Sequence, residues 1–312
     1  MTERTVEQVE PVERTEQAQP AHPLEHVTVT GTRTLRIALW GPPASGRTTM
    51  LGVLRQAAET MPASRWRVRG DDFHTREFLQ AADNATIDER RFPGVEAGGN
   101  EYTYLFSRRA RAARWDRRPD RPRFRAVLLD LPDLCDAAPD RAPAALAECA
   151  GLIYLFDPVS ERDSTHEAAF ERFVELLDEA PALPSRLAIC VTKIDATGVF
   201  AKARSEGWVE LDRRGRVRIT DPRRYYEWLS GTGGTYAGRA RAGLLRDLDL
   251  GRFPRTRHYA TSATGFRTDA ADRVNPDQCR TVDSLGALEA PPRPQGVVEP
   301  ILDMYPGLAT KG

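Results

Sequence analysis

Five short runs of apolar residues are spread along the chain and alternate with segments of helical periodicity. The first run covers residues 34–40 and leads directly into glycine and two prolines. The later runs cover residues 126–129, 152–156, 187–191 and 258–260. Almost uninterrupted apolar runs are typical of parallel strands buried on both faces of a sheet. Strands alternating with helices therefore predict an α/β fold with a doubly wound, mostly parallel sheet and right-handed crossovers.

The length and the local composition predict one enlarged domain behind a tail. Residues 1–33 are rich in Glu, Gln, Thr and Pro. Such a segment buries too little apolar surface to offset its ordering entropy, so we expect a disordered acidic tail, with a partner-binding arm as the alternative. Residues 34–310 are predicted to form the domain, with insertions at about 65–122 and 199–250. Two strands near residues 66–68 and 102–106 are expected in the first insertion, and an amphipathic helix ending near Leu248 in the second.

Composition excludes several classes of function. No run of about 18 apolar residues is present, so no transmembrane helix is expected, and the first ten residues lack the apolar core of a secretory signal. The four cysteines lie far apart, which argues against a disulfide framework or a zinc site. With 45 basic and 45 acidic residues, the chain as a whole is not an obvious nucleic-acid binder. A soluble cytoplasmic protein with reduced thiols is expected.

Eight residues join the first predicted strand to the first predicted helix. They are Gly41, Pro42, Pro43, Ala44, Ser45, Gly46, Arg47 and Thr48. The glycines let the backbone curl so that successive N–H groups face one anion, and the start of the helix adds partial positive charge. This context indicates a phosphate-binding loop in which the Thr48 hydroxyl binds Mg²⁺. An ordinary Gly/Pro turn before a helix is the alternative.

Arg47 departs from the usual form of such a loop, where lysine is expected. Lysine places a compact charge between phosphates, whereas the wide planar fork of arginine fits less well there, although it binds phosphate strongly. The two prolines also stiffen the loop. Lysine is rare in this chain, since its only lysines are Lys193, Lys202 and Lys311.

Three further polar segments follow predicted strands. Asp130 follows the run at 126–129, in the crevice where α/β sheets bind ligands. In a P-loop protein this aspartate would hold Mg²⁺ through water, and a turn or capping role is the alternative. Residues 192–195 follow the run at 187–191, and Asp195 can accept hydrogen bonds from the N1–H and 2-amino groups of guanine, which adenine cannot supply. A surface turn is the alternative for this segment. Residues 261–263 follow the last strand, where Ser262 could contact the guanine carbonyl; this short segment means little alone.

In their order along the chain, these four segments resemble the motifs of GTPases of the translation-factor-related P-loop class. The chain is similar in particular to bacterial double-GTPase and conflict-system GTPase domains, over roughly residues 34–265. The resemblance implies a fold of the P-loop NTPase type that binds GTP or GDP together with Mg²⁺. The residues implied to bind nucleotide are Gly41, Pro43, Ala44, Ser45, Gly46, Arg47, Thr48, Thr49, Thr192, Lys193, Asp195, Ser262 and Ala263. The residues implied to bind the metal are Thr48 and Asp130.

Departures from this pattern favour binding over hydrolysis. The family expects a glycine that senses the γ-phosphate where this chain has Asp133, and Leu134 follows where a water-orienting glutamine is common. The switch threonine is not identified by the sequence, with Thr86 and Thr103 as candidates. Catalytic residues are therefore left unassigned. Rapid hydrolysis would need an arginine from elsewhere, which is worth about 10³–10⁵ in rate.

Residues 101–125 contain nine arginines and three acidic residues. A surface for nucleic acid or an acidic partner, a solvated hairpin, and an arginine that reaches the γ-phosphate are the three interpretations, with the hairpin favoured.

For the chain as a whole we expect a Mg²⁺-dependent GTP-binding switch with slow or partner-assisted hydrolysis, acting through a protein effector or activator. A degenerate P-loop scaffold for protein interactions is the alternative. A P-loop small-molecule kinase is a third, against which residues 192–195 argue.

Overall fold

The computed structural model describes residues 32–60, 66–94, 101–108, 123–159, 164–212, 216–232, 252–270, 274, 282 and 287–305. The predicted tail, apart from its last two residues, lies outside these ranges. So do most of the arginine-rich segment and the predicted helix ending near Leu248.

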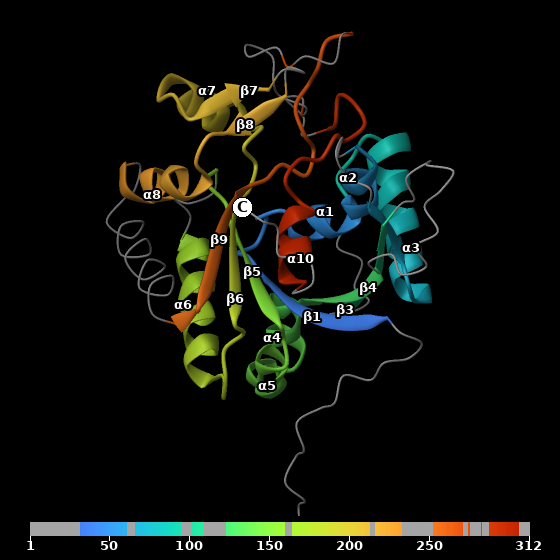
Figure 1. Ribbon diagram of the computed structural model, residues 1–312, viewed down its shortest axis with the longest axis vertical. Coiled ribbons are helices and arrows are strands. Elements are labelled where there is room, and N and C mark those ends of the chain that lie inside the picture. The colour runs from blue at the N-terminus through green and yellow to red at the C-terminus, as the bar shows by residue number, and fades with distance from the viewer. Residues whose placement is uncertain are drawn as a thin grey trace, which may run out of the picture.

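Seven strands form the main sheet, in the order β2-β3-β4-β1-β5-β6-β9 (Figure 1). Their bounds are β1 Arg33–Trp40, β2 Trp66–Gly70, β3 Glu101–Arg108, β4 Arg123–Asp130, β5 Gly151–Phe156, β6 Arg186–Val191 and β9 Arg255–Ala260. From β4 through β1, β5 and β6 to β9, neighbouring strands are parallel. Only β3 runs against its neighbours β2 and β4. The predicted α/β fold with a mostly parallel sheet is therefore confirmed.

Helices cover both faces of this sheet, as expected for a doubly wound fold of the P-loop NTPase type (Figure 1). One face carries α1 Arg47–Gly52, α2 Leu54–Thr60, α3 Phe73–Asp83 and α10 Glu299–Met304. The π-helical turn η1 Asn84–Asp88 extends α3. The other face carries α4 Leu131–Ala137, α5 Ala142–Ala147, α6 Ser164–Glu179 and α8 Pro222–Thr232, with the 3₁₀ turn η2 Pro139–Arg141 after α4. The helix α7 Thr197–Ser205 lies beyond the carboxyl end of β6, outside this layer (Figure 1). None of the helices in the described ranges combines the length and apolar character needed to cross a bilayer.

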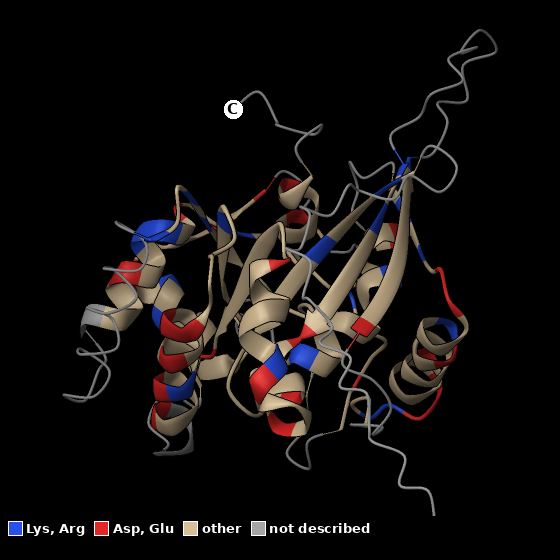
Figure 2. Ribbon diagram, turned by 90° about the horizontal axis from the view of Figure 1, so that it is seen from below, with Lys and Arg blue, Asp and Glu red and all other residues tan. Residues whose placement is uncertain are grey.

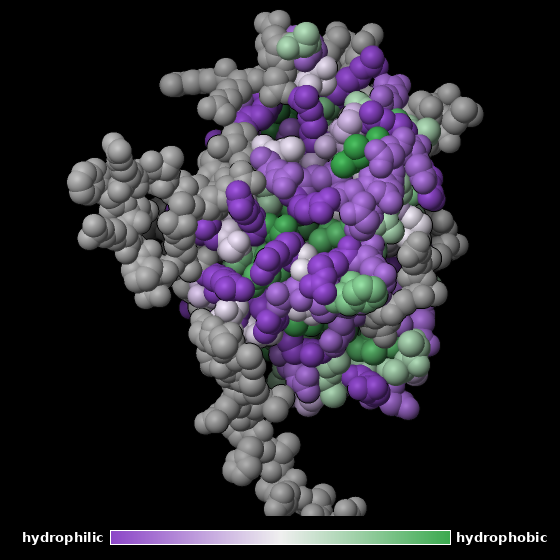
Figure 3. Space-filling view, turned by 90° about the vertical axis from the view of Figure 1, so that its right-hand side faces the viewer, coloured by the Kyte–Doolittle hydropathy of each residue, from purple (hydrophilic) through white to green (hydrophobic). Residues whose placement is uncertain are grey.

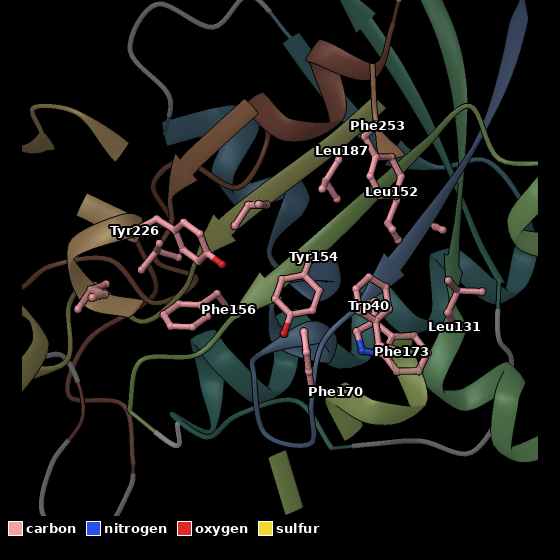
Figure 4. Packing of buried hydrophobic residues seen from close by; sticks show 14 of the residues in the cluster. Trp40, Leu131, Leu152, Tyr154, Phe156, Phe170, Phe173, Leu187, Tyr226 and Phe253 are labelled. Atoms are coloured by element: carbon pink, nitrogen blue, oxygen red, sulfur yellow. The ribbon is translucent and has the colours of Figure 1, made fainter. Parts of the chain in front are cut away.

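The core of the α6 face is built largely from aromatic side chains that fill the space between strands and helix (Figure 4). The rings of Trp40 and Phe173 lie 5.1 Å apart, centre to centre, and the tilted ring of Tyr154 lies at the same distance from Phe173. Charged residues gather on the helices, whereas the strands are mostly uncharged (Figure 2). Burial of this apolar surface holds β1 and β5 in place and so fixes the loops that leave their carboxyl ends.

The two predicted insertions differ in what they add. The first supplies β2 and β3 to the main sheet. The second supplies the separate hairpin of β7 Val209–Leu211 and β8 Val217–Ile219. The last predicted strand also differs from expectation: none of the residues of β9 is fully buried, Arg255 and Arg257 are exposed, and the predicted run 258–260 is half-buried. It is the outermost described strand on its side, so its side chains have a strand neighbour on one side only.

Candidate functional site

The loop between β1 and α1 forms a concave turn of the backbone. Ala44 and Gly46 both have left-handed conformations, with φ of 62° and 95°. The Ser45 N–H donates to the Pro42 carbonyl at 3.1 Å, and the Met50 N–H donates to the Gly46 carbonyl at 2.8 Å, which starts the helix. A left-handed non-glycine residue costs about 1–3 kcal/mol, so the fold sustains strain at Ala44. Left-handed turns next to helical ones point successive N–H groups into one cavity suited to an anion.

Ser45 provides a second sign that this loop is built for a ligand. The side chain is buried, and within the described part of the chain its Oγ has no hydrogen-bond partner. A side chain at Gly41 would press on this hydroxyl and on Leu155, so glycine at this position leaves room for the present place of Ser45. A buried polar atom left unpaired costs about 1–3 kcal/mol, and a bound anion would relieve that cost. The loop residues present thus fit a phosphate group.

Arg47 forms ion pairs with the two acidic residues that face it. Its guanidinium bonds to Asp130 at the end of β4, and the same nitrogen lies 3.4 Å from Asp133 in the first turn of α4. The pKa of Asp130 is raised to about 6: burial is the largest cause and the charge of Asp133 adds to it, while Arg47 and the Asp133 N–H act in the opposite direction. The cation and both acids are therefore paired with one another in this structure.

Thr48 and Asp130 bring one hydroxyl and one carboxylate to the phosphate end of the site. The described residues contain no group of three His, Cys, Asp or Glu side chains placed to hold a metal ion. Magnesium prefers octahedral oxygen ligands and is commonly held by one or two carboxylates together with substrate phosphates. These residues fit Mg²⁺ on two conditions. Phosphate oxygens must complete the coordination shell of the metal, and Asp130 must leave its ion pair with Arg47 to bind the metal.

Neither candidate switch threonine is set apart by its contacts. Thr86 is buried in η1, where its hydroxyl donates to the Ala82 carbonyl at 2.8 Å and accepts from Gln56. Thr103 lies within β3, opposite Val127 of β4. The structure therefore singles out neither residue as a metal ligand.

The segment after β6 is anchored to the end of β5. The Thr192 N–H and hydroxyl both donate to the Phe156 carbonyl, at 2.8 and 3.1 Å. Lys193 adopts a left-handed φ of 54°, and its Nζ donates to Asp157 Oδ2 at 2.7 Å. The Asp157 side chain is fully buried and also accepts from the Val159 N–H at 2.9 Å. Lys193 is thus paired with a carboxylate that directly follows the neighbouring strand β5.

Asp195 is buried, and the loop after β9 contacts it. The Thr264 hydroxyl donates to Asp195 Oδ2 at 2.5 Å. The Ser262 N–H donates to the Gln295 carbonyl at 2.9 Å, and the Ser262 hydroxyl accepts from the Gly265 N–H at 2.7 Å. A contact from Ser262 to a base would therefore have to come from its hydroxyl hydrogen. The contact from Ala263 stays a prediction.

Sequence reasoning did not identify Asp157 or Thr264. Asp157 directly follows the apolar run at 152–156, just as Asp130 follows the run at 126–129, so the same rule would have found it. Thr264 has no such signal, because its role depends on how the last loop folds against β6.

All four predicted segments leave the same edge of the sheet. The parallel register pairs Trp40 with Tyr154, Phe156 with Val191, and Val191 with Ala260. The loop at 41–48 follows β1, Asp130 ends β4, residues 192–195 follow β6, and residues 261–263 follow β9. Ligands of open α/β sheets bind at this carboxyl edge. The arrangement can therefore present a phosphate cradle and a base-reading carboxylate to one ligand.

Comparison with known proteins gives only distant likenesses. No family model and no curated protein matches the chain. Among solved structures it is similar to the signal recognition particle receptor SRb-GTP/SRX complex from Chaetomium thermophilum, with 11% identity, 77% of this chain and 95% of that chain covered, and a TM-score of 0.39. It is also similar to an ADP-ribosylation factor-like GTP-binding protein (small COPII coat GTPase) from Encephalitozoon cuniculi in complex with GDP, with 10% identity, coverage of 74% and 70%, and a TM-score of 0.33. A third is Sup35 complexed with GDP, with 14% identity and a TM-score of 0.34; 82% of this chain is covered but only 44% of that one.

Proposed function

We propose that this chain binds guanine nucleotide, GTP or GDP, with Mg²⁺, and acts as a nucleotide-dependent switch through a protein partner. One observation carries the proposal. Two segments lie at the same edge of the sheet: the strained loop with the unpaired Ser45 hydroxyl, and the segment that bears Lys193 and Asp195. The Lys193–Asp157 pair connects the second segment to the end of β5, the strand beside β1.

In this proposal the loop holds the phosphates. The N–H groups around Ala44 and Gly46 face the anion, and Arg47 turns from its aspartates toward the phosphates. Thr48 and Asp130 would hold Mg²⁺, which neutralises phosphate charge when bound. Because the metal and Arg47 compete for Asp130, metal and nucleotide are expected to bind together.

The base is read by the residues after β6 and β9. Asp195 accepts hydrogen bonds from the two donors on the Watson–Crick edge of guanine, and the stem of Lys193 lies along the purine face. An adenine base would leave the Asp195 carboxylate without these donors, which is the physical origin of the selectivity.

Hydrolysis is proposed to be slow without a partner. Asp133 places a negative charge beside Arg47, where a third phosphate would need positive charge. An arginine or water-orienting group from an activating protein would supply what the described residues do not.

A scaffold that turns over little or no nucleotide is the second candidate, and one observation favours it. Arg47 already has two carboxylate partners, so a phosphate must displace an existing ion pair. Such ion pairs are expected if Arg47 has only a structural role and connects the loop after β1 to the end of β4 and the start of α4.

Equilibrium binding of fluorescent GDP, GTP and ATP, with and without Mg²⁺, distinguishes the nucleotide switch from the scaffold. Guanine binding that exceeds adenine binding and depends on Mg²⁺ supports the switch. Equal binding of ATP and GTP contradicts the role of Asp195. Absence of binding for all three, in a chain that unfolds cooperatively, leaves the scaffold.

A further inference from the structure

A cavity of about 500 Å³ opens at the carboxyl end of β2, three strands away from β1 in the sheet. Its lining comes from α2, the end of β2 and α3, and comprises Arg55, Arg69, Gly70, Asp71, Arg76, Leu79 and Gln80. None of these residues belongs to the nucleotide site proposed above. The side of the molecule that carries α3 is dominated by hydrophilic side chains (Figure 3).

The cavity carries an excess of positive charge. Arg125 pairs with Asp71 at 2.5 Å, and Arg55 pairs with the buried Asp83. Arg76 donates to the Asp71 carbonyl at 3.3 Å. Within the described ranges neither Arg69 nor Arg76 forms an ion pair with a carboxylate. Arg125 and Asp83 lie beside the cavity and do not line it. Of the lining residues themselves, three are arginines and one, Asp71, is acidic, so the lining has two positive charges in excess.

The arginines are held by elements that cannot easily move apart. A Cβ added at Gly70 would lie 2.7 Å from the backbone nitrogen of Arg76, so the end of β2 and the start of α3 are in close backbone contact. Asp72 caps α3 by accepting from the Thr75 N–H at 2.6 Å. Gln56 of α2 donates to Asp83 of α3 at 2.8 Å. Like charges are thus kept together by the fold, an arrangement that a bound anion would stabilise.

We propose that this cavity is a second ligand site, for a small polar molecule bearing a phosphate group. The arginine fork matches phosphate oxygens in pairs, and a phosphate monoester carries about −1.5 to −2 charges at neutral pH, close to the excess in the cavity. The volume lies within the range of small-molecule sites and exceeds what one phosphate fills. Leu79 is the one large apolar side chain among the described lining residues, so the rest of the ligand is polar, as in a sugar phosphate.

The position at a carboxyl edge supports the proposal. Because β2 runs antiparallel to β3, and β3 antiparallel to β4, the end of β2 points the same way as the end of β4. The cavity therefore lies at the same edge of the sheet as the loop at 41–48, where open α/β sheets bind ligands. Its arginines come from three different elements, which distinguishes it from a charged helix surface.

Titration calorimetry with inorganic pyrophosphate and with glucose 6-phosphate tests the site on the full chain. We expect Arg69→Gln and Arg76→Gln each to weaken binding of glucose 6-phosphate about tenfold, the loss expected for one charge-assisted hydrogen bond. Arg67→Gln is the matched control, since Arg67 is exposed on the same strand two residues away and does not line the cavity. All three replaced side chains are exposed, and a melting curve for each variant checks that it folds.

Pyrophosphate can also enter the loop at 41–48, so an Arg47→Ala variant separates the two sites. Loss of pyrophosphate binding in Arg47→Ala alone, with Arg69→Gln and Arg76→Gln unaffected, overturns the proposal. Equal losses in Arg67→Gln show unspecific attraction to arginine and also overturn it. Tighter binding of a glutamate-rich peptide than of either phosphate compound would assign the cavity to an acidic protein partner instead. The test does not depend on guanine nucleotide binding, so either proposal can fail alone.

Discussion

The base end and the phosphate end of the proposed nucleotide site hold their charged groups in opposite ways. At the base end, Lys193 is bonded to Asp157 and Asp195 to Thr264, so the groups that would meet a purine are set by their own neighbours. At the phosphate end, Arg47 is bonded to Asp130, the residue that would help to hold the metal. The base end is ready for a ligand, whereas the phosphate end must exchange partners to accept one.

This difference separates selectivity from affinity. Preorganised groups discriminate between bases without a cost of rearrangement. The phosphate end must break an ion pair of which one member, Asp130, is 5% exposed. We therefore expect changes at the base end to alter which nucleotide binds, and changes at the phosphate end to alter the dependence on metal and pH.

The largest effect is expected from Asp195→Ala. Two hydrogen bonds to a charged group are worth about 1.5–3 kcal/mol each, so GDP affinity should fall roughly 10²–10⁴-fold. Inosine diphosphate lacks the 2-amino group, and its disadvantage relative to GDP should disappear in this variant because the acceptor is gone. Competition binding with both nucleotides measures this. If the variant still prefers GDP to inosine diphosphate, Asp195 does not read the base.

The second effect concerns the support of the base end. Asp157→Asn keeps the shape but leaves Lys193 without its charged partner. Lys193 is 32% exposed and can turn toward water, so we expect a loss of about 1–3 kcal/mol in unfolding free energy rather than the full cost of an isolated buried charge. Chemical denaturation measures this loss.

The control for Asp157→Asn is Glu227→Gln, which breaks the exposed Arg223–Glu227 pair and should cost about 0.5 kcal/mol or less. Equal losses in the two variants would mean that the buried pair does not organise the base end.

A smaller change, with the opposite sign, is expected from Arg47→Lys. A single guanidinium nitrogen of Arg47 contacts both carboxylates, whereas a lysine ammonium is strongly hydrated and sits on a flexible stem, so its pairing with them should be weaker. With this restraint weakened, GDP should bind about 3–10-fold more tightly in the presence of Mg²⁺. Arg36→Lys, which alters a cation paired with Glu101 and lying 3.8 Å from Glu148, is the control and should leave GDP affinity unchanged. Weaker binding by Arg47→Lys would show that the guanidinium itself holds phosphate.

The two ends also differ in how far the sequence could predict them. The strands and their common edge follow from apolar runs, because a strand buried on both faces has little choice of side chain. The polar residues that end those runs then fall at one edge by topology alone. This reasoning placed Asp130 and Asp195, and the same rule reaches Asp157.

The pairing at the phosphate end could not be predicted in this way. Arg47 and Asp130 are separated by 83 positions, and their contact depends on side-chain conformations. The same holds for the Ser262 N–H, which is occupied by Gln295 from a segment without a periodic pattern. The apolar runs in the sequence predict which polar residues lie at the carboxyl edge of the sheet. Which of these residues pair with one another in the absence of a ligand depends on tertiary packing.

The smallest expected effect is a shift in pH dependence at the phosphate end. Burial raises the pKa of Asp130 from 3.8 to about 6. Protonated Asp130 cannot hold a cation, so Mg²⁺-dependent GDP affinity should fall as the pH drops below about 6. A raised carboxyl pKa also means that the folded state binds more protons than the unfolded state between about pH 4 and 6. The contribution of this group to stability therefore decreases as the pH rises through that window.

Asp133→Asn removes the like charge that contributes to this raised pKa, so the midpoint of metal-dependent binding should move to lower pH, by less than about one unit. Asp136→Asn is the control, because Asp136 lies in the same helix but pairs with Arg172 in an exposed position. GDP affinities with and without Mg²⁺ across about pH 5–8 give the two midpoints. A midpoint that stays in place in Asp133→Asn, or moves equally in Asp136→Asn, would mean that metal binding is not governed by Asp130. In that case a bound nucleotide and its metal would not need to displace Arg47 from Asp130. The two ends would then differ only in which residues are paired.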